Sequence, residues 1–180
     1  MFFQITTFLL DVAAGLLGGA CLLRLYMQAQ RIPFGNPVGR FVFALSDWIV
    51  LPLRKVLPAY RRWDASSVLA AWLIELAQYG LVALMIGRGW GAIPLLAVFG
   101  LIRLAISGAT GLVIVYAILS WVNADSPMAD VIERLAAPML RPLRRLIPLV
   151  GGLDLSPLAF LVALQVLAII VANVQDSLLR

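Results

Sequence analysis

The chain has 180 residues, of which 63% are hydrophobic and 13% are charged, and its net charge is +5. A soluble domain carries about 25% charged residues, so the composition excludes an ordinary soluble domain, whose core could not hide this many apolar side chains. One cysteine and no histidine exclude an intrachain disulfide, and they exclude zinc sites and bis-histidine haem ligation within the chain, so we expect no metal and no cofactor.

Four apolar stretches, at residues 5–27, 67–86, 92–121 and 157–174, are predicted to be transmembrane helices. Each is long enough to cross a hydrocarbon core of about 30 Å, which takes roughly 20 helical residues. The first stretch lacks the basic n-region of a secretory signal and is therefore predicted to be a retained span. A glycine-rich turn at 87–91 joins the second and third spans.

Both longer connections between the spans contain an amphipathic pattern. Asn36-Pro37 and Ser126-Pro127 each place a capping residue before a proline suited to the first helical position. Apolar residues then recur at the helical period with charges on the opposite face, which predicts a helix lying in the membrane interface. Internal prolines are expected to end or kink both helices. These prolines are Pro52, Pro138 and Pro142, and the apolar positions are Phe41, Val42, Leu45, Trp48, Ile49, Met128, Val131, Ile132, Leu135 and Met139.

The placement of basic residues predicts the orientation. The two longer connections hold most of them, whereas the opposite side holds only Arg88 and Arg180. Because cytoplasmic loops are enriched in Lys and Arg, we predict that both connections are cytoplasmic and that both termini are periplasmic, in a bacterial inner membrane. The basic residues of the connections are Arg31, Arg40, Arg54, Lys55, Arg61 and Arg62 in the first, and Arg134, Arg141, Arg144 and Arg145 in the second.

The sequence contains an internal repeat. A shift of 90 residues aligns 1–90 with 91–180 without a gap, most clearly at 52–58 against 142–148. Repeats of this kind determine the whole fold. Each unit contains two spans, so both units enter the membrane in the same direction and are parallel, not inverted. The predicted fold is an all-α membrane protein with four transmembrane helices in two parallel helix–loop–helix repeats, each with an interfacial amphipathic helix.

The motifs PLRK at 52–55 and PLRR at 142–145, closed by Pro58 and Pro148, resemble those of the YggT family of small membrane proteins. The resemblance covers essentially the whole chain in both repeats. It implies an association with cell-division organisation, with osmotic or ion homeostasis and, in plastids, with nucleoid distribution and cytochrome assembly, but it implies no agreed biochemical activity. Further matching segments are 24–28, 36–37, 40–42, 47–48, 120–121, 126–127, 137–138, 140–141, 147–148 and 152–157.

Six basic residues of the amphipathic helices are candidate binding residues. Juxtamembrane Lys and Arg attract anionic head groups by about 1 kcal/mol per residue. The sequence leaves three interpretations open, in which the six residues enforce topology, hold anionic lipid or dock a membrane-protein partner. The flanking prolines give these blocks a fixed shape, which topology alone does not require. The six are Arg40, Arg54, Lys55, Arg141, Arg144 and Arg145.

Charged residues also fall within the predicted spans. The repeat places Asp11 and Arg103 at similar depth, and because intramembrane charges tend to pair, we expect an ion pair that joins the two repeats. For Glu75 the sequence leaves open protonation, a pair with Arg24 near the cytoplasmic end of its span, an ion path, or a role as interhelical glue, as for the aligned Gln165.

Glycines mark the first span of each repeat, at Gly15, Gly18, Gly19, Gly108 and Gly111. Small residues permit close approach of helices. That approach can occur within the protein or between copies, so the sequence allows a homo-oligomer.

No catalytic constellation is present, because there is no histidine to act as a triad base and no phosphate-binding glycine loop with its lysine. We therefore predict a non-enzymatic inner-membrane scaffold or assembly factor with a basic cytoplasmic surface. The alternative is an ion or small-solute channel, or an osmotic-stress factor, whose path is lined by Asp11, Glu75 and Arg103. The basic residues lie where membrane topology requires them, so nucleic acid is not an expected partner.

Overall fold

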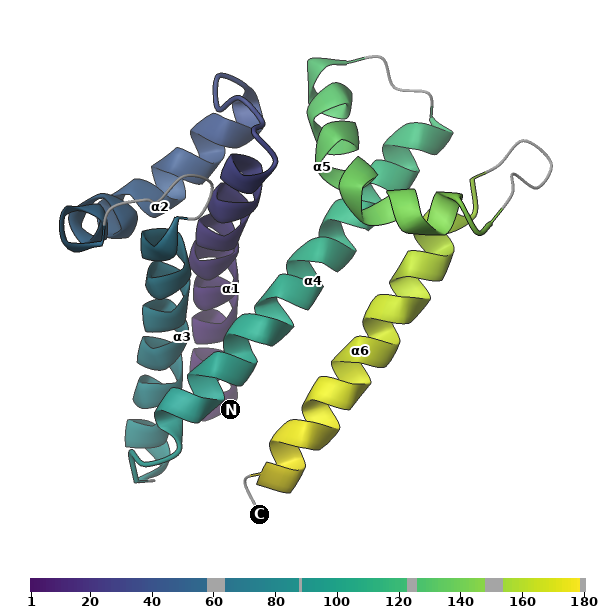
Figure 1. Cartoon of the computed structure of the whole chain (residues 1–180). Helices are drawn as coiled ribbons and strands as arrows, with labels where there is room; N and C mark the ends of the chain where they lie inside the picture. The colour runs from purple at the N-terminus through teal and green to yellow at the C-terminus, as the bar shows by residue number, and fades with distance from the viewer. Residues whose placement is uncertain (58–63, 88, 123–125, 148–153, 179–180) are drawn as a thin grey trace.

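The computed structural model, shown in Figure 1, describes residues 1–57, 64–87, 89–122, 126–147 and 154–178. Within these residues every regular element is a helix, which confirms the predicted all-α class. The helices are α1 (Phe2–Ala29), α2 (Pro37–Val56), α3 (Ala65–Ile86), α4 (Ile93–Trp121), α5 (Pro127–Arg144) and α6 (Ser156–Leu178).

Four of the helices, α1, α3, α4 and α6, are long and apolar enough to cross a membrane, as predicted. Their outward faces carry many large exposed apolar side chains, and contact of so many of them with water would be unfavourable in free energy. Phe8, for example, is 64% exposed and Val162 is 65% exposed. Because these faces need lipid as their solvent, the chain is a multi-pass membrane protein.

The two amphipathic helices begin where the capping residues predicted. Asn36 Oδ1 accepts a hydrogen bond from the Gly39 amide at 2.9 Å, and Ser126 Oγ accepts one from the Ala129 amide at 3.1 Å. Of the two expected effects of the internal prolines, ending the helix is not observed, because α2 continues through Pro52 to Val56 and α5 continues through both of its prolines to Arg144. The other effect is observed in α5, which bends along its length in Figure 1, because proline removes a backbone hydrogen bond.

Figure 1 shows α2 and α5 at the same end of the bundle, while the start of α1 and the end of α6 lie at the opposite end. Within the first half, α1 packs against α3 and α2. Helix α4 joins the halves, because it contacts α1 and α3 on one side and α5 and α6 on the other.

Three buried clusters follow this arrangement. One lies in the first half around the fully buried Cys21, and another lies in the second half around Val113 and Leu140. The third joins the halves near α2 and α5. It contains Met27, Ile32 and Val42 from the first half and Val131 and Leu135 from the second. The Tyr26 hydroxyl adds a hydrogen bond to the Leu135 carbonyl at 2.8 Å, so the halves are held together at this end by both apolar and polar contacts.

Candidate functional site

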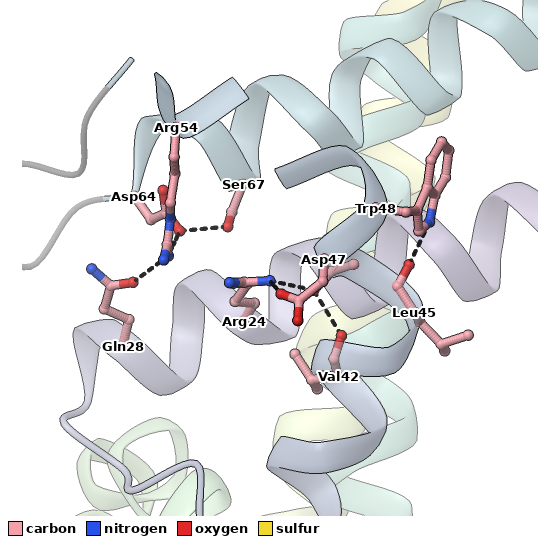
Figure 2. Close-up of polar contacts among 10 residues, drawn as sticks. Arg24, Gln28, Val42, Leu45, Asp47, Trp48, Arg54, Asp64 and Ser67 are labelled. Atoms are coloured by element: carbon pink, nitrogen blue, oxygen red, sulfur yellow. Dashed lines mark hydrogen bonds and ion pairs between the residues drawn. The ribbon is translucent and has the colours of Figure 1, made fainter. Parts of the chain in front are cut away.

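An ion pair between Arg54 and Asp64 ties α2 to the start of α3 (Figure 2). Asp64 is completely buried, and its Oδ2 also accepts a hydrogen bond from Ser67 Oγ at 2.8 Å. The guanidinium of Arg54 also donates to Gln28 Oε1 of α1 at 3.3 Å. One arginine therefore fixes the amphipathic helix to both spans of its own half.

The second half repeats this arrangement at the aligned positions. Arg144 Nε donates to Asp154 Oδ2 at 2.8 Å, just before α6 begins. The same guanidinium donates to the Tyr116 hydroxyl of α4 and lies 5.5 Å from the centre of that ring. Asp154 Oδ1 accepts from the Ser156 amide at 2.9 Å. Arg144 therefore ties α5 to α4 and α6, as Arg54 ties α2 to α1 and α3.

A further polar contact exists in the first half alone. Arg24 of α1 is 2% exposed and donates to Ser46 Oγ at 2.8 Å and to Asp47 Oδ1 at 2.6 Å (Figure 2). Its guanidinium lies 4.7 Å from the centre of the Phe43 ring. The second half cannot make this contact, because apolar residues occupy the aligned positions. They are Ile114, Ala136 and Ala137.

The six candidate basic residues therefore divide into two groups. Arg54 and Arg144 are engaged in ion pairs that hold the helices in place. The other four are exposed, and none of them pairs with a carboxylate among the residues that the structure describes. We call these four the basic surface: Arg40, Lys55, Arg141 and Arg145. Four other arginines that contribute to the predicted orientation lie outside the described residues: Arg61, Arg62, Arg88 and Arg180.

The predicted ion pair between Asp11 and Arg103 is wrong. Asp11 of α1 instead accepts a hydrogen bond from Gln78, and Arg103 of α4 donates one to the Tyr79 hydroxyl. Both partners lie on α3. The repeat predicted the depth of the two charges, but the direction in which each side chain points depends on helix packing, and α3 offers a nearer partner to each.

Glu75 is 5% exposed and faces α4 at Gly100, where a Cβ would overlap its carboxylate. The alternative of a Glu75–Arg24 pair is wrong, because Arg24 bonds to α2. Asp11 and Arg103 nevertheless both bond to residues of α3 that lie one helical turn from Glu75, so the three charged residues make an intramembrane polar cluster with Gln78 and Tyr79. The aligned Gln165 is exposed on α6.

This geometry predicts a difference between two double-mutant cycles. An Asp11→Ala/Gln78→Ala cycle should show a coupling energy of about 0.5–1 kcal/mol, because the two side chains bond directly, whereas an Asp11→Ala/Arg103→Ala cycle should be close to additive. Chemical denaturation in detergent micelles measures both. Stronger coupling in the second cycle would restore the ion pair expected from the sequence.

Two cavities formed by the described residues lie between the helices. One of about 460 Å³ lies between α1, α3 and α4 and reaches from Asp64 to Trp72 and Leu101. The other, of about 720 Å³, is a groove between the two halves, with α1 and α2 on one side and α4 and α5 on the other. Among the described lining residues, neither cavity includes Asp11, Glu75 or Arg103.

The Arg144–Asp154 pair predicts a loss of stability in acid. Burial raises the pKa of Asp154, but hydrogen bonds from Ser156 and Arg144 outweigh burial and hold the pKa below its ordinary value of 3.8. A carboxyl group with a lowered pKa in the folded state stabilises the fold above the unfolded pKa, and this stabilisation is lost as the pH falls through the folded value. We expect the unfolding temperature of the wild type to fall below pH 3.8 and that of Asp154→Asn to fall less.

Sequence reasoning missed Asp64 and Asp154 as partners of the two arginines. The signal was present, since both aspartates align at the repeat offset and each follows its arginine by ten residues. Gln28 aligns with Ile118, and Tyr116 aligns with Tyr26, whose hydroxyl bonds to the Leu135 carbonyl instead, so the repeat alone could not identify these two partners.

The CCB3/YggT family model matches the chain twice in tandem, at residues 3–85 and 95–175. An uncharacterised protein of Escherichia coli K12 named YggT is 36% identical over 177 residues, which cover 95% of this chain and 91% of that protein. An uncharacterised protein of Vibrio alginolyticus is 35% identical over 80% of each chain, and one of Pseudomonas aeruginosa is 32% identical over 84% of this chain and 80% of its own. No solved structure matches.

Proposed function

This chain belongs to the CCB3/YggT family, and on that premise we propose that it is a non-enzymatic scaffold or assembly factor of the bacterial inner membrane. In this role it would present a basic surface to anionic lipid and to a membrane-protein partner. The family resemblance links such a role to the organisation of cell division or of membrane complexes.

The proposal rests on the observation that two of the arginines hold the helices in place while other basic residues remain exposed. Arg54 and Arg144 lock α2 and α5 to the spans, so the basic surface is displayed on helices whose position is fixed. Topology alone requires basic residues on this side of the membrane, but it does not require them to stand on rigidly held helices at one end of the bundle. A fixed display of charge suits recognition of a shaped partner.

We further propose that α2 and α5 face the cytoplasm and that both termini are periplasmic. The excess of positive charge at the α2 and α5 end supports this orientation. Single cysteines introduced at Gly35, which is exposed between α1 and α2, and at Gln4 should label from opposite sides of inverted and right-side-out vesicles. The native Cys21 is buried and leaves the background low.

Photo-crosslinking in native membranes tests the scaffold. A crosslinking amino acid at Arg40 and, separately, at Arg141 should capture the same protein, and the adduct should disappear when the basic surface is changed to glutamine. Val162 on α6 is a matched control that faces lipid. Adducts with lipid alone at both basic sites would contradict the proposal.

An ion or small-solute path is the second candidate, and the intramembrane polar cluster favours it. Buried Glu75 lies among charged and polar groups from three helices. Against it, neither the cavity beside Asp64 nor the groove between the halves is lined by Glu75 or by the other cluster charges, among the residues that the structure describes. Flux into liposomes that is abolished by Glu75→Gln would select this function over the scaffold.

A further inference from the structure

The groove between the two halves is held open by glycines. A Cβ placed on Gly15, Gly108 or Gly111 would meet no atom within 4 Å, and one on Gly19 would touch only Leu104 at 3.9 Å. Gly18 differs, because its Cβ would come within 2.7 Å of Leu104. Close packing inside the chain therefore accounts for Gly18 but not for the four glycines that line the groove.

The dimensions of the groove decide what can enter it. Its lining on α1 runs from Gly15 to Ala29, which at 1.5 Å per residue is about 21 Å. A transmembrane helix spans about 30 Å of hydrocarbon, so the groove runs along only part of the length of such a helix. The groove is therefore too short to hold a whole transmembrane helix of a partner or of a second copy. An acyl chain, which occupies a single leaflet, is a closer match to this length.

The depth of the groove matches a single leaflet. Half of a bilayer, with its head-group region included, is about 20–22 Å, and the groove begins at the α2 and α5 end, where Gln30 lines it, and ends near Gly15. Its walls are otherwise almost entirely apolar. A lipid of the leaflet that α2 and α5 face could place its head group at Gln30 and its acyl chain beside the glycines.

A positively charged residue, Arg31, follows the last lining residue of the groove on the α1 side. Arg31, which follows Gln30, has a φ angle of 57°. This is a left-handed backbone conformation that residues other than glycine adopt infrequently. This turn lets the Ile32 amide donate to the Met27 carbonyl at 2.9 Å and buries Ile32 against α5. Arg31 remains exposed and pairs with no carboxylate in the described part of the chain. Together with the basic surface on the neighbouring helices, it makes this end complementary to an anionic head group.

We propose that the groove binds a single anionic phospholipid, with an acyl chain between α1 and α4 and the phosphate beside Arg31. The site is distinct from the basic surface, and it depends on a membrane location but not on the scaffold role. Binding of this lipid would fill the space between the halves without displacing any contact that joins them.

Native mass spectrometry of the full chain tests the site after extraction from vesicles that contain equal amounts of phosphatidylglycerol and phosphatidylethanolamine. The wild type should retain one phosphatidylglycerol. Gly108→Leu, and more completely Gly15→Leu/Gly108→Leu, should lose it because leucine side chains fill the open space. Both variants should fold, since leucine favours helix over glycine by roughly 1 kcal/mol. Arg31→Gln should retain a lipid without preference for phosphatidylglycerol.

Ala163→Leu is the matched control, because it adds bulk to an exposed position on α6 that does not line the groove. It should retain the lipid as the wild type does. Equal loss in this control would identify the retained lipid as part of the general annulus and overturn the proposal. Retention in the double variant would overturn it as well, and so would a change from dimer to monomer in Gly108→Leu with lipid unchanged, which would make the groove an interface between copies.

Discussion

Replacing Arg54 with Met is expected to destabilise the protein by about 3 kcal/mol, at the low end of the range for breaking a buried ion pair. The cause is the aspartate that remains. Asp64 is 0% exposed, so its charge is left buried without a partner once the guanidinium is gone, and α2 loses the Arg54 bonds to Gln28 and to the start of α3. Chemical denaturation of the purified protein in detergent micelles measures the change in the free energy of unfolding.

The second half supplies the control for this prediction. Arg144→Met breaks the aligned pair, but the Asp154 side chain is 23% exposed and can recover hydration, so the loss should be smaller. Arg54→Met/Asp64→Asn should recover part of the stability lost in Arg54→Met, because it removes the buried charge. Equal losses at both arginines, with no recovery in the double variant, would mean that the pairs act through side-chain packing and not through charge.

Substituting Gly39 with Ala is expected to destabilise the start of α2 by about 3 kcal/mol, the upper part of the range for overpacking. Its Cβ would lie within 2.7 Å of the Phe34 Cα and carbonyl carbon. These are backbone atoms and cannot rotate away, so α2 must shift. The shift should weaken the hydrogen bond by which the Asn36 side chain accepts from the Gly39 amide and caps the helix. Denaturation measures the loss, and trypsin cleavage after the exposed Arg31 should become faster.

Gly35 provides the comparison, because a Cβ at that position would meet nothing within 4 Å and its φ is not positive. Gly35→Ala should therefore leave both the free energy of unfolding and the cleavage rate close to those of the wild type. If the two alanine variants behave alike, the loss reflects the flexibility of the connection and not the contact between Gly39 and Phe34.

Most of the fold could be predicted from the sequence because the bilayer imposes simple physical demands. Spans must be long and apolar, and the capping residues Asn36 and Ser126 place the starts of α2 and α5 correctly. The prolines inside those helices left open whether each helix ends or kinks. A helix can continue through a proline when packing holds the flanking turns, and α5, which packs against α4 and α6, continues and bends.

The polar contacts were harder to predict, because they depend on the direction in which each side chain points. Counting residues gives the depth of a charge in the membrane, but the partner it meets depends on the rotation of each helix, which the packing of all the helices decides together. Asp11 and Arg103 share a depth and yet bond to different residues of α3. The pairs at Arg54 and Arg144 could have been found, because the repeat carries the aspartate along with the arginine.

Arg24 gives the first half a second tether between its amphipathic helix and its first span, and Ile114 at the aligned position leaves the second half with one. A cooperative unit held at fewer points opens at lower free energy. The duplicated halves are thus unequally held, and α5 is the amphipathic helix with fewer polar tethers to its first span. Opening of the α2 and α5 end should begin at α5, and it must break the contacts of Arg144 with Asp154 and Tyr116 as well as the packing of α5 against α4 and α6.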